Sequence, residues 1–134
     1  MNGRVLAPGS ADAIAIVLRE PLSLWGGMDP ASGEVIDARH PQRGKNLAGR
    51  IVVMPAARGS SSSSSVLAEA VRAGHAPAGI LLAEADLILA VGAAVAEELY
   101  GVRVPIVVVA PGELALIADG QAVAISEEGE ITLG

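Results

Sequence analysis

The chain has 134 residues, a net charge of −6, 51% hydrophobic residues, 1% aromatic residues and no cysteine. This composition predicts a single folded domain over residues 1–134, with a core built from aliphatic side chains. It excludes disulfides, a thiolate nucleophile, iron–sulfur ligation by this chain and the usual Cys/His zinc site, and its acidic balance argues against nucleic-acid binding.

Targeting signals are not evident in the sequence. The longest apolar runs are too short to span a bilayer: Ala13–Leu18, Leu87–Val95 and Ile106–Ala110. The N-terminus lacks the basic-then-apolar pattern of a secretory signal. We therefore expect a cytoplasmic protein.

The first third of the chain is predicted to contain short strands and turns. Apolar runs favour strands at Arg4–Ala7 and Ala13–Leu18. Gly26-Gly27 and Asp29-Pro30 are strong turn signals, so this region should be an irregular loop followed by a hairpin around residues 32–37. A further loop, which begins at His40-Pro41, should lead into the next strand.

From residue 49 onward, strands and helices alternate. The expected strands are Gly49–Met54, Gly79–Leu82 and Pro105–Ala110, and the expected helices cover residues 64–73 and 86–100. Strands that are apolar along their whole length are typical of a parallel sheet buried on both faces. A helical turn at Pro111-Gly112 and a closing hairpin, Ala122–Ile125 with Glu130–Leu133, should follow. The predicted fold class is α/β, with a β-rich layer and a small β-α-β-α-β unit.

Arg58-Gly59 and the six serines Ser60–Ser65 stand between an expected strand and an expected helix. A glycine and small hydroxyl residues at such a junction direct backbone N–H groups and hydroxyls to one place. Unpaired N–H groups and the helix dipole both favour negative charge there. The segment is therefore a candidate site for an anion or an oxygen-rich substrate.

Simpler interpretations of the serine run are a flexible linker or a helix cap. A linker would divide the chain into two pieces near the lower limit for independent folding, and both flanks are apolar and periodic. A cap requires only one serine and does not explain Arg58-Gly59. The segment lacks the Gly-Lys-Ser/Thr of a phosphate-binding loop, and a Ser60/His40/Asp29 hydrolase is a further, less favoured arrangement.

Several motifs together resemble the aconitase X swivel domain, or small subunit: residues 21–37, His40-Pro41, Arg58-Gly59-Ser60 with Ser64 and Leu67, residues 74–78, and Pro105-Ile106-Val107. The resemblance implies a swivelling β/β/α domain like the C-terminal domain of aconitase. It also implies a lyase, either a cis-3-hydroxy-L-proline dehydratase or a phosphomevalonate dehydratase. A larger partner subunit would then carry the iron–sulfur cluster and most of the substrate pocket.

In enzymes of this kind a swivel-domain serine is the base, and the resemblance gives that role to Ser60 first and Ser64 second. A serine hydroxyl is a poor base, so its alkoxide would need nearby cations and N–H donors. Arg58 and the helix N-terminus near Ser63–Ser65 could supply them. The remaining candidate substrate-binding residues are Gly59, Ser61, Ser62, Gly26, Gly27, Asp29 and His40.

The loop residues Asp29 and His40 have simpler explanations, a turn cap and a surface histidine respectively. The scarcity of basic residues near the serine run favours a hydroxyproline-type acid over a phosphorylated substrate. The alternative to a dehydratase subunit is a non-catalytic module that binds a small anion or a partner protein through the serine-rich loop.

Overall fold

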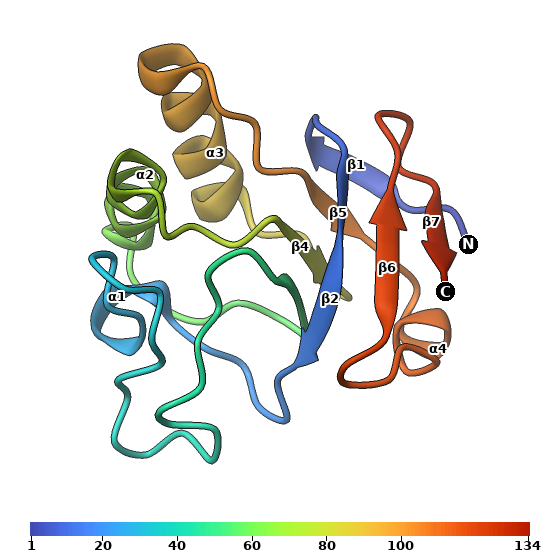
Figure 1. Cartoon of the computed structure of the whole chain (residues 1–134), viewed down its shortest axis with the longest axis horizontal. Helices are drawn as coiled ribbons and strands as arrows, with labels where there is room; N and C mark the ends of the chain where they lie inside the picture. Colours follow the sequence, from blue (N-terminus) through green and yellow to red (C-terminus); the bar gives the residue numbers. More distant parts are fainter.

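The apolar runs of the sequence form one mixed seven-stranded sheet in the computed structural model, which describes all residues 1–134 (Figure 1). The strands are β1 (Arg4–Ala7), β2 (Ala11–Val17), β3 (Ile51–Met54), β4 (Gly79–Leu82), β5 (Ile106–Val108), β6 (Ala122–Ile125) and β7 (Ile131–Leu133). The helices are α1 (Leu24–Gly27), α2 (Ser63–Ala73), α3 (Leu87–Tyr100) and α4 (Pro111–Leu114). None of these helices combines the length and hydrophobicity needed to cross a membrane.

The centre of the sheet is parallel and its margins are antiparallel. The strand order is β1-β5-β4-β3-β2-β6-β7, with β2, β3, β4 and β5 pairing in parallel. The flanking pairs β1–β5, β2–β6 and β6–β7 are antiparallel. The predicted α/β class, the β-α-β-α-β unit and the closing hairpin are therefore confirmed, and all the strands share one sheet.

Strand β2 joins the two parts of the sheet because its halves have different partners. Residues 11–14 pair with β6, and residues 15–17 pair with β3. At the far edge, Asn2 bridges Glu130, and the Gly3 N–H donates to the Gly129 carbonyl at 2.9 Å. The N-terminal segment thus meets the hairpin of β6 and β7, the sheet curls into a half-barrel, and the two termini lie close together (Figure 1).

Two apolar cores flank strand β3, which is buried at every position. Val52 and Met54 belong to the core beneath α2 and α3, whereas Ile51 and Val53 belong to the core enclosed with β6, β7 and α4. Successive strand residues point to opposite faces. Burial on both faces is therefore the reason that β3 is continuously apolar, as expected for a central parallel strand.

One predicted element does not form as expected. The hairpin predicted around residues 32–37 is reduced to isolated antiparallel bridges, Met28–Val35 and Glu34–Asn46. Local turns use the backbone groups that a strand ladder would need, since the Ser32 and Gly33 N–H groups both donate to the Asp29 carbonyl. The expected irregular loop before it contains the short turn α1, in which Trp25 and Gly26 have non-helical backbone angles.

Helices α2 and α3 lie side by side against the sheet (Figure 1). Their backbones approach each other closely at Gly92. A Cβ atom at Gly92 would lie 2.7 Å from the Ser64 carbonyl oxygen and 2.9 Å from the Ser64 Cα. Both atoms belong to the backbone, so no side-chain rotation can relieve the contact. Gly92 therefore determines how near α3 lies to the start of α2.

Gly92→Ala should destabilise the fold even though alanine is the better helix former. Alanine in a helix gains about 1 kcal/mol over glycine, but forcing a methyl group into a close-packed contact costs about 1–3 kcal/mol. We expect a net loss of roughly 1 kcal/mol, measured by urea unfolding. Gly112→Ala is the matched control, because no atom lies within 4 Å of its added Cβ. Equal stability of the two variants would contradict the close contact.

Candidate active site at the serine loop

The serine loop, defined as residues 58–65, connects β3 to α2 and ends in the first turn of that helix. It follows the carboxyl end of a central parallel strand. Ligands of open α/β sheets bind outside this edge, because the strands present their loops there. The segment predicted from the sequence thus lies at the edge of the sheet where ligands of such folds bind, and much of it is exposed.

Gly59 allows the serine loop to run against the segment before α1. Its φ of +112° lies in a region that residues with a side chain rarely adopt. A Cβ atom at Gly59 would collide with the Ser23 hydroxyl and lie 2.8 Å from the Ser23 Cβ. Just before it, Ala57 bridges Leu22, and the Arg58 N–H donates to the Leu22 carbonyl at 3.2 Å. Two segments far apart in sequence are therefore joined.

Ser63 is the buried member of the serine run, with 3% of its surface exposed. Its hydroxyl accepts a hydrogen bond from the Trp25 backbone N–H at 3.2 Å and lies 3.5 Å from the Ser23 hydroxyl. The run of identical residues does not by itself separate Ser63 from its neighbours. The structure does, because this hydroxyl holds the Trp25-Gly26-Gly27 turn against α2.

Ser60 has a hydroxyl that is available for chemistry. Its Oγ accepts the Ser62 backbone N–H at 3.1 Å, and its own hydrogen has no acceptor within the chain. The Ser64 hydroxyl, in contrast, donates to the Ser61 carbonyl at 2.8 Å. The two serines predicted as candidate bases therefore differ. The Ser60 oxygen accepts a backbone hydrogen bond, whereas the Ser64 hydroxyl donates its hydrogen to a carbonyl of the same loop.

The N–H donors of the loop lie one turn earlier than expected. The N–H groups of Ser63, Ser64 and Ser65 donate to the carbonyls of residues 60, 61 and 62, at 2.9, 3.3 and 3.1 Å. The N–H groups of Gly59, Ser60 and Ser61 have no acceptor within the chain. The expectation that Ser63–Ser65 offer free donors is therefore wrong, and the free donors are those of residues 59–61.

Arg58 supplies a cation at the entrance to the serine loop. Its side chain is exposed and takes part in none of the ion pairs of the chain, which involve Arg72 and Arg103 instead. Farther along α2, a hydrogen bond from Arg72 holds the pKa of the Glu69 carboxyl below its ordinary value. Glu69 is already paired by that bond, so Arg58 remains the free charge of the loop.

Gly26 and Gly27 lie in the turn that Ser63 anchors. Gly26 has a φ of +76°, and its added Cβ would meet no atom within 4 Å. A Cβ at Gly27 would lie 2.8 Å from the Leu22 Cδ1. The turn thus lies at the start of α2, with its open side at Gly26 and with Trp25 59% exposed.

Asp29 and His40 are occupied by hydrogen bonds of their own loops. Asp29 Oδ1 accepts from the Ala31 N–H at 2.9 Å, which is the turn cap considered from the sequence. His40 is buried rather than on the surface. Its Nδ1 accepts the Gln42 N–H, so its Nε2 carries the hydrogen and donates to the Glu20 carbonyl at 3.0 Å.

These contacts exclude the Ser60/His40/Asp29 hydrolase arrangement in this structure. A triad requires a histidine nitrogen free to accept the serine proton and a carboxylate on the other nitrogen. Both ring nitrogens of His40 are taken by backbone groups, and neither partner belongs to Ser60 or Asp29. No group of three or more His, Cys, Asp or Glu side chains is placed to hold a metal ion.

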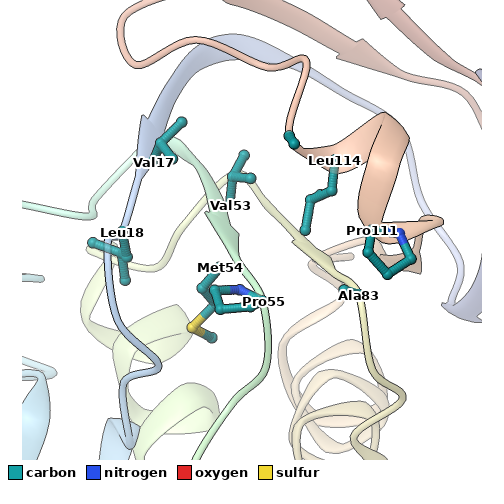
Figure 2. Close-up of a pocket in the computed structure, with 9 residues that line it drawn as sticks. Val17, Leu18, Val53, Met54, Pro55, Ala83, Pro111 and Leu114 are labelled. Carbon is teal, nitrogen blue, oxygen red and sulfur yellow. The ribbon is translucent and has the colours of Figure 1, made fainter.

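A separate apolar cavity of about 200 Å³ lies at the carboxyl ends of β2 and β3, against α4 (Figure 2). Figure 2 shows Leu114 and Pro111 of α4 facing Val53 and Pro55 of the strand β3 end. None of the site residues predicted from the sequence lines it. Its lining suits an apolar group, so the polar serine loop is the better candidate for chemistry.

The fold and the loop define a swivel-type α/β domain with a serine-rich loop at the sheet edge, and the comparisons specify the family. The chain belongs to the aconitase X swivel domain family, whose profile matches residues 1–133. The whole fold aligns with the crystal structure of Thermococcus kodakaraensis aconitase X in its holo-form, with a TM-score of 0.88 and 33% identity, over 99% of this chain and 96% of that chain. A solution NMR structure of a UPF0107 protein aligns with a TM-score of 0.87 and 32% identity.

Relatives of two kinds match the sequence. A cis-3-hydroxy-L-proline dehydratase of Pseudomonas aeruginosa is 52% identical over 103 residues, which are 77% of this chain and 18% of that protein. A phosphomevalonate dehydratase small subunit of Thermococcus kodakarensis is 39% identical over 97 residues, 72% of this chain and 73% of that protein. The chain thus spans about a fifth of the length of the hydroxyproline dehydratases it matches, and most of the length of the small subunits.

Ser63→Ala should loosen the turn that carries Gly26 and Gly27. The Trp25 N–H would lose its acceptor, and we expect the free energy of unfolding to fall by about 1 kcal/mol. Amide hydrogen exchange at Trp25, followed by ¹⁵N NMR, should become faster. Ser61→Ala removes an exposed hydroxyl that makes no side-chain hydrogen bond and should leave both quantities unchanged. An unchanged exchange rate at Trp25 in Ser63→Ala would show that the turn is held by other contacts.

Proposed function

We propose that this chain is the swivel component, or small subunit, of an aconitase X-type dehydratase, and that Ser60 is the base that removes a proton from a substrate carbon. The reaction class is that of a hydro-lyase, in which a proton and a hydroxyl leave neighbouring carbons as water and a double bond remains. Family membership and the dehydratase names of the relatives support this class.

The observation that carries the assignment of Ser60 is the hydrogen bond from the Ser62 N–H to its Oγ. An N–H donor aimed at the oxygen stabilises the alkoxide relative to the alcohol, which is the requirement for a serine base. The positive charge of Arg58, which stands close to Ser60 in the sequence, favours the same ionised form. Ser64 is the second candidate, because its proton is committed to a carbonyl in this arrangement.

The free N–H groups of residues 59–61 and the Arg58 guanidinium would bind the carboxylate of a small hydroxy acid. Gly26, Gly27 and Ser62 complete the proposed substrate-binding set, since Ser63 holds their turn beside the loop. We leave Asp29 and His40 out of this set, because Asp29 Oδ1 caps its own turn and both ring nitrogens of His40 bond to backbone groups. A single free cation favours a hydroxyproline-type acid over 5-phosphomevalonate, whose phosphate would need further positive charge.

The family implies an iron–sulfur cluster, and the residues of this chain do not fit one. The sequence has no cysteine, and no acidic or histidine cluster replaces a thiolate set. We therefore derive no step through the cluster and place it in a larger partner subunit. The chain should be inactive without that partner.

A non-catalytic module is the second candidate function. The unpaired N–H groups of residues 59–61 beside the free Arg58 could bind a carboxylate or phosphate without any reaction. Such a module would bind the anion alone and gain no activity from a partner. The two proposals are therefore separated by the requirement for the partner.

The six single Ser→Ala variants of residues 60–65 test the proposal in the complex with the large aconitase X subunit encoded by the same genome. Ser60→Ala should lower kcat by about a thousand-fold, the scale expected when a general base is lost. Ser61→Ala and Ser65→Ala, whose side chains are exposed, should retain near-normal kcat. Turnover is measured with cis-3-hydroxy-L-proline and with 5-phosphomevalonate, so that the preferred substrate is identified in the same experiment.

Two controls make the outcome clear. The isolated wild-type chain should show no turnover, and its turnover without a partner would refute the subunit proposal. Co-elution of Ser60→Ala with the large subunit would show that its lost activity is chemical. If Ser60→Ala stays active while Ser64→Ala does not, the base is Ser64. If all six variants stay active, the serine loop is not catalytic.

A further inference from the structure

Helix α3 carries apolar side chains on the face that points away from the protein. Its inner face, which packs on the rest of the chain, consists of Leu89, Gly92, Ala93 and Ala96. Four further apolar residues, spaced four apart, form what we call the outer face of α3. They are Leu87, Val91, Val95 and Leu99, with exposed fractions of 69%, 55%, 40% and 64%.

A helix that is apolar all round is normally buried all round. Single exposed apolar residues are common on protein surfaces, but a contiguous line of them marks an interaction surface. Spacing of i, i+4, i+8 and i+12 places the four side chains in one line along the helix. This chain packs against only one side of α3, so the apolar side chains of the outer face remain exposed to solvent.

The outer face of α3 is continuous with the serine loop. A groove of about 210 Å³ between α2 and α3 is lined by Ser64 and Ser65 on one side and by Val95 and Tyr100 on the other. Gly92 holds the two helices together at Ser64. In Figure 1, α2 and α3 form the flank of the molecule opposite β6, β7 and the termini. A body that closes over the serine loop from this flank would also meet the outer face.

The negative charge at the C-terminal end of the outer face indicates which charge a partner would carry there. Glu97 is paired with Arg103, but Glu98 is exposed and forms no ion pair. It lies in the last turn of α3, which contains no basic residue and where the helix dipole is also negative. A complementary surface would therefore be apolar along the helix and positive at the Glu98 end.

We propose that the outer face of α3 is the docking surface of the larger dehydratase component, which presents an apolar groove with a basic side chain opposite Glu98. The inference rests on the proposed function, since it identifies where the partner of the serine loop binds. This docking surface explains why α3 has a line of exposed apolar residues and why that line meets the groove between α2 and α3.

A second copy of this chain is a poorer occupant. Helix α3 is about 21 Å long at 1.5 Å per residue, and one helix pair of that length buries less than the roughly 1,200 Å² of a stable interface. Each copy also carries a charge of −6, so self-association brings like charges together. A larger body of complementary charge does not have these limits.

Val91→Glu and Leu99→Glu test the surface in the full chain, with the large aconitase X subunit of the same genome as the probe. Each variant should weaken the complex by at least about thirty-fold, the scale of a central interface residue. Leu116→Glu is the matched control, because Leu116 is 67% exposed and lies near α4, away from α3. Glu98→Lys should weaken binding more at low salt than at high salt. Binding is measured by isothermal titration calorimetry, with melting temperatures to confirm folding.

The outcomes separate this inference from the proposed function. At saturating large subunit, both α3 variants should regain near-normal kcat, since the serine loop is unchanged. If the wild-type complex forms and is active while both variants bind as tightly as wild type, the docking surface is elsewhere and the proposed function stands. If wild type does not bind the large subunit, both fail. A dimer of the isolated chain that Val91→Glu dissociates, seen by sedimentation, would make a second copy the occupant.

Discussion

The close approach of α2 to α3 is the constraint on which the functional region depends. The chain has one Trp, one Tyr and no Phe, so the layer between sheet and helices is filled by aliphatic side chains. Small residues permit short distances between helices, and Gly92 lies directly against the Ser64 backbone. The start of α2 is thereby held in place, and the serine loop leads directly into it.

The serine run performs several tasks with one residue type. Ser63 turns inward and accepts the Trp25 N–H, Ser64 bonds the preceding turn, and Ser60 keeps a hydroxyl that an N–H group supports as an acceptor. Serine suits all of these positions because it is small and can donate or accept. Burial and hydrogen bonding therefore separate the serines that stabilise the fold from the one whose hydroxyl hydrogen has no acceptor in the chain.

The domain exposes a polar surface, the serine loop, next to an apolar one, the outer face of α3. The serine loop offers a hydroxyl, free N–H groups and one cation, but no residues that fit the cluster implied by the family. The outer face of α3 meets this loop through a shared groove. If the proposals above hold, one partner surface would contact both the serine loop and the outer face of α3.

The sequence by itself determined the β-α-β-α-β order, the closing hairpin and the position of the serine loop, because apolar periodicity and glycine or proline turns act over short stretches of chain. It did not show that Ser63 is the buried serine of the run, and it missed the burial of His40. The partners of these residues, Trp25 and Glu20, lie 38 and 20 residues away and meet them only in the folded chain. Long-range contacts decide which polar group is satisfied internally, and so only the tertiary structure decided which are left for chemistry.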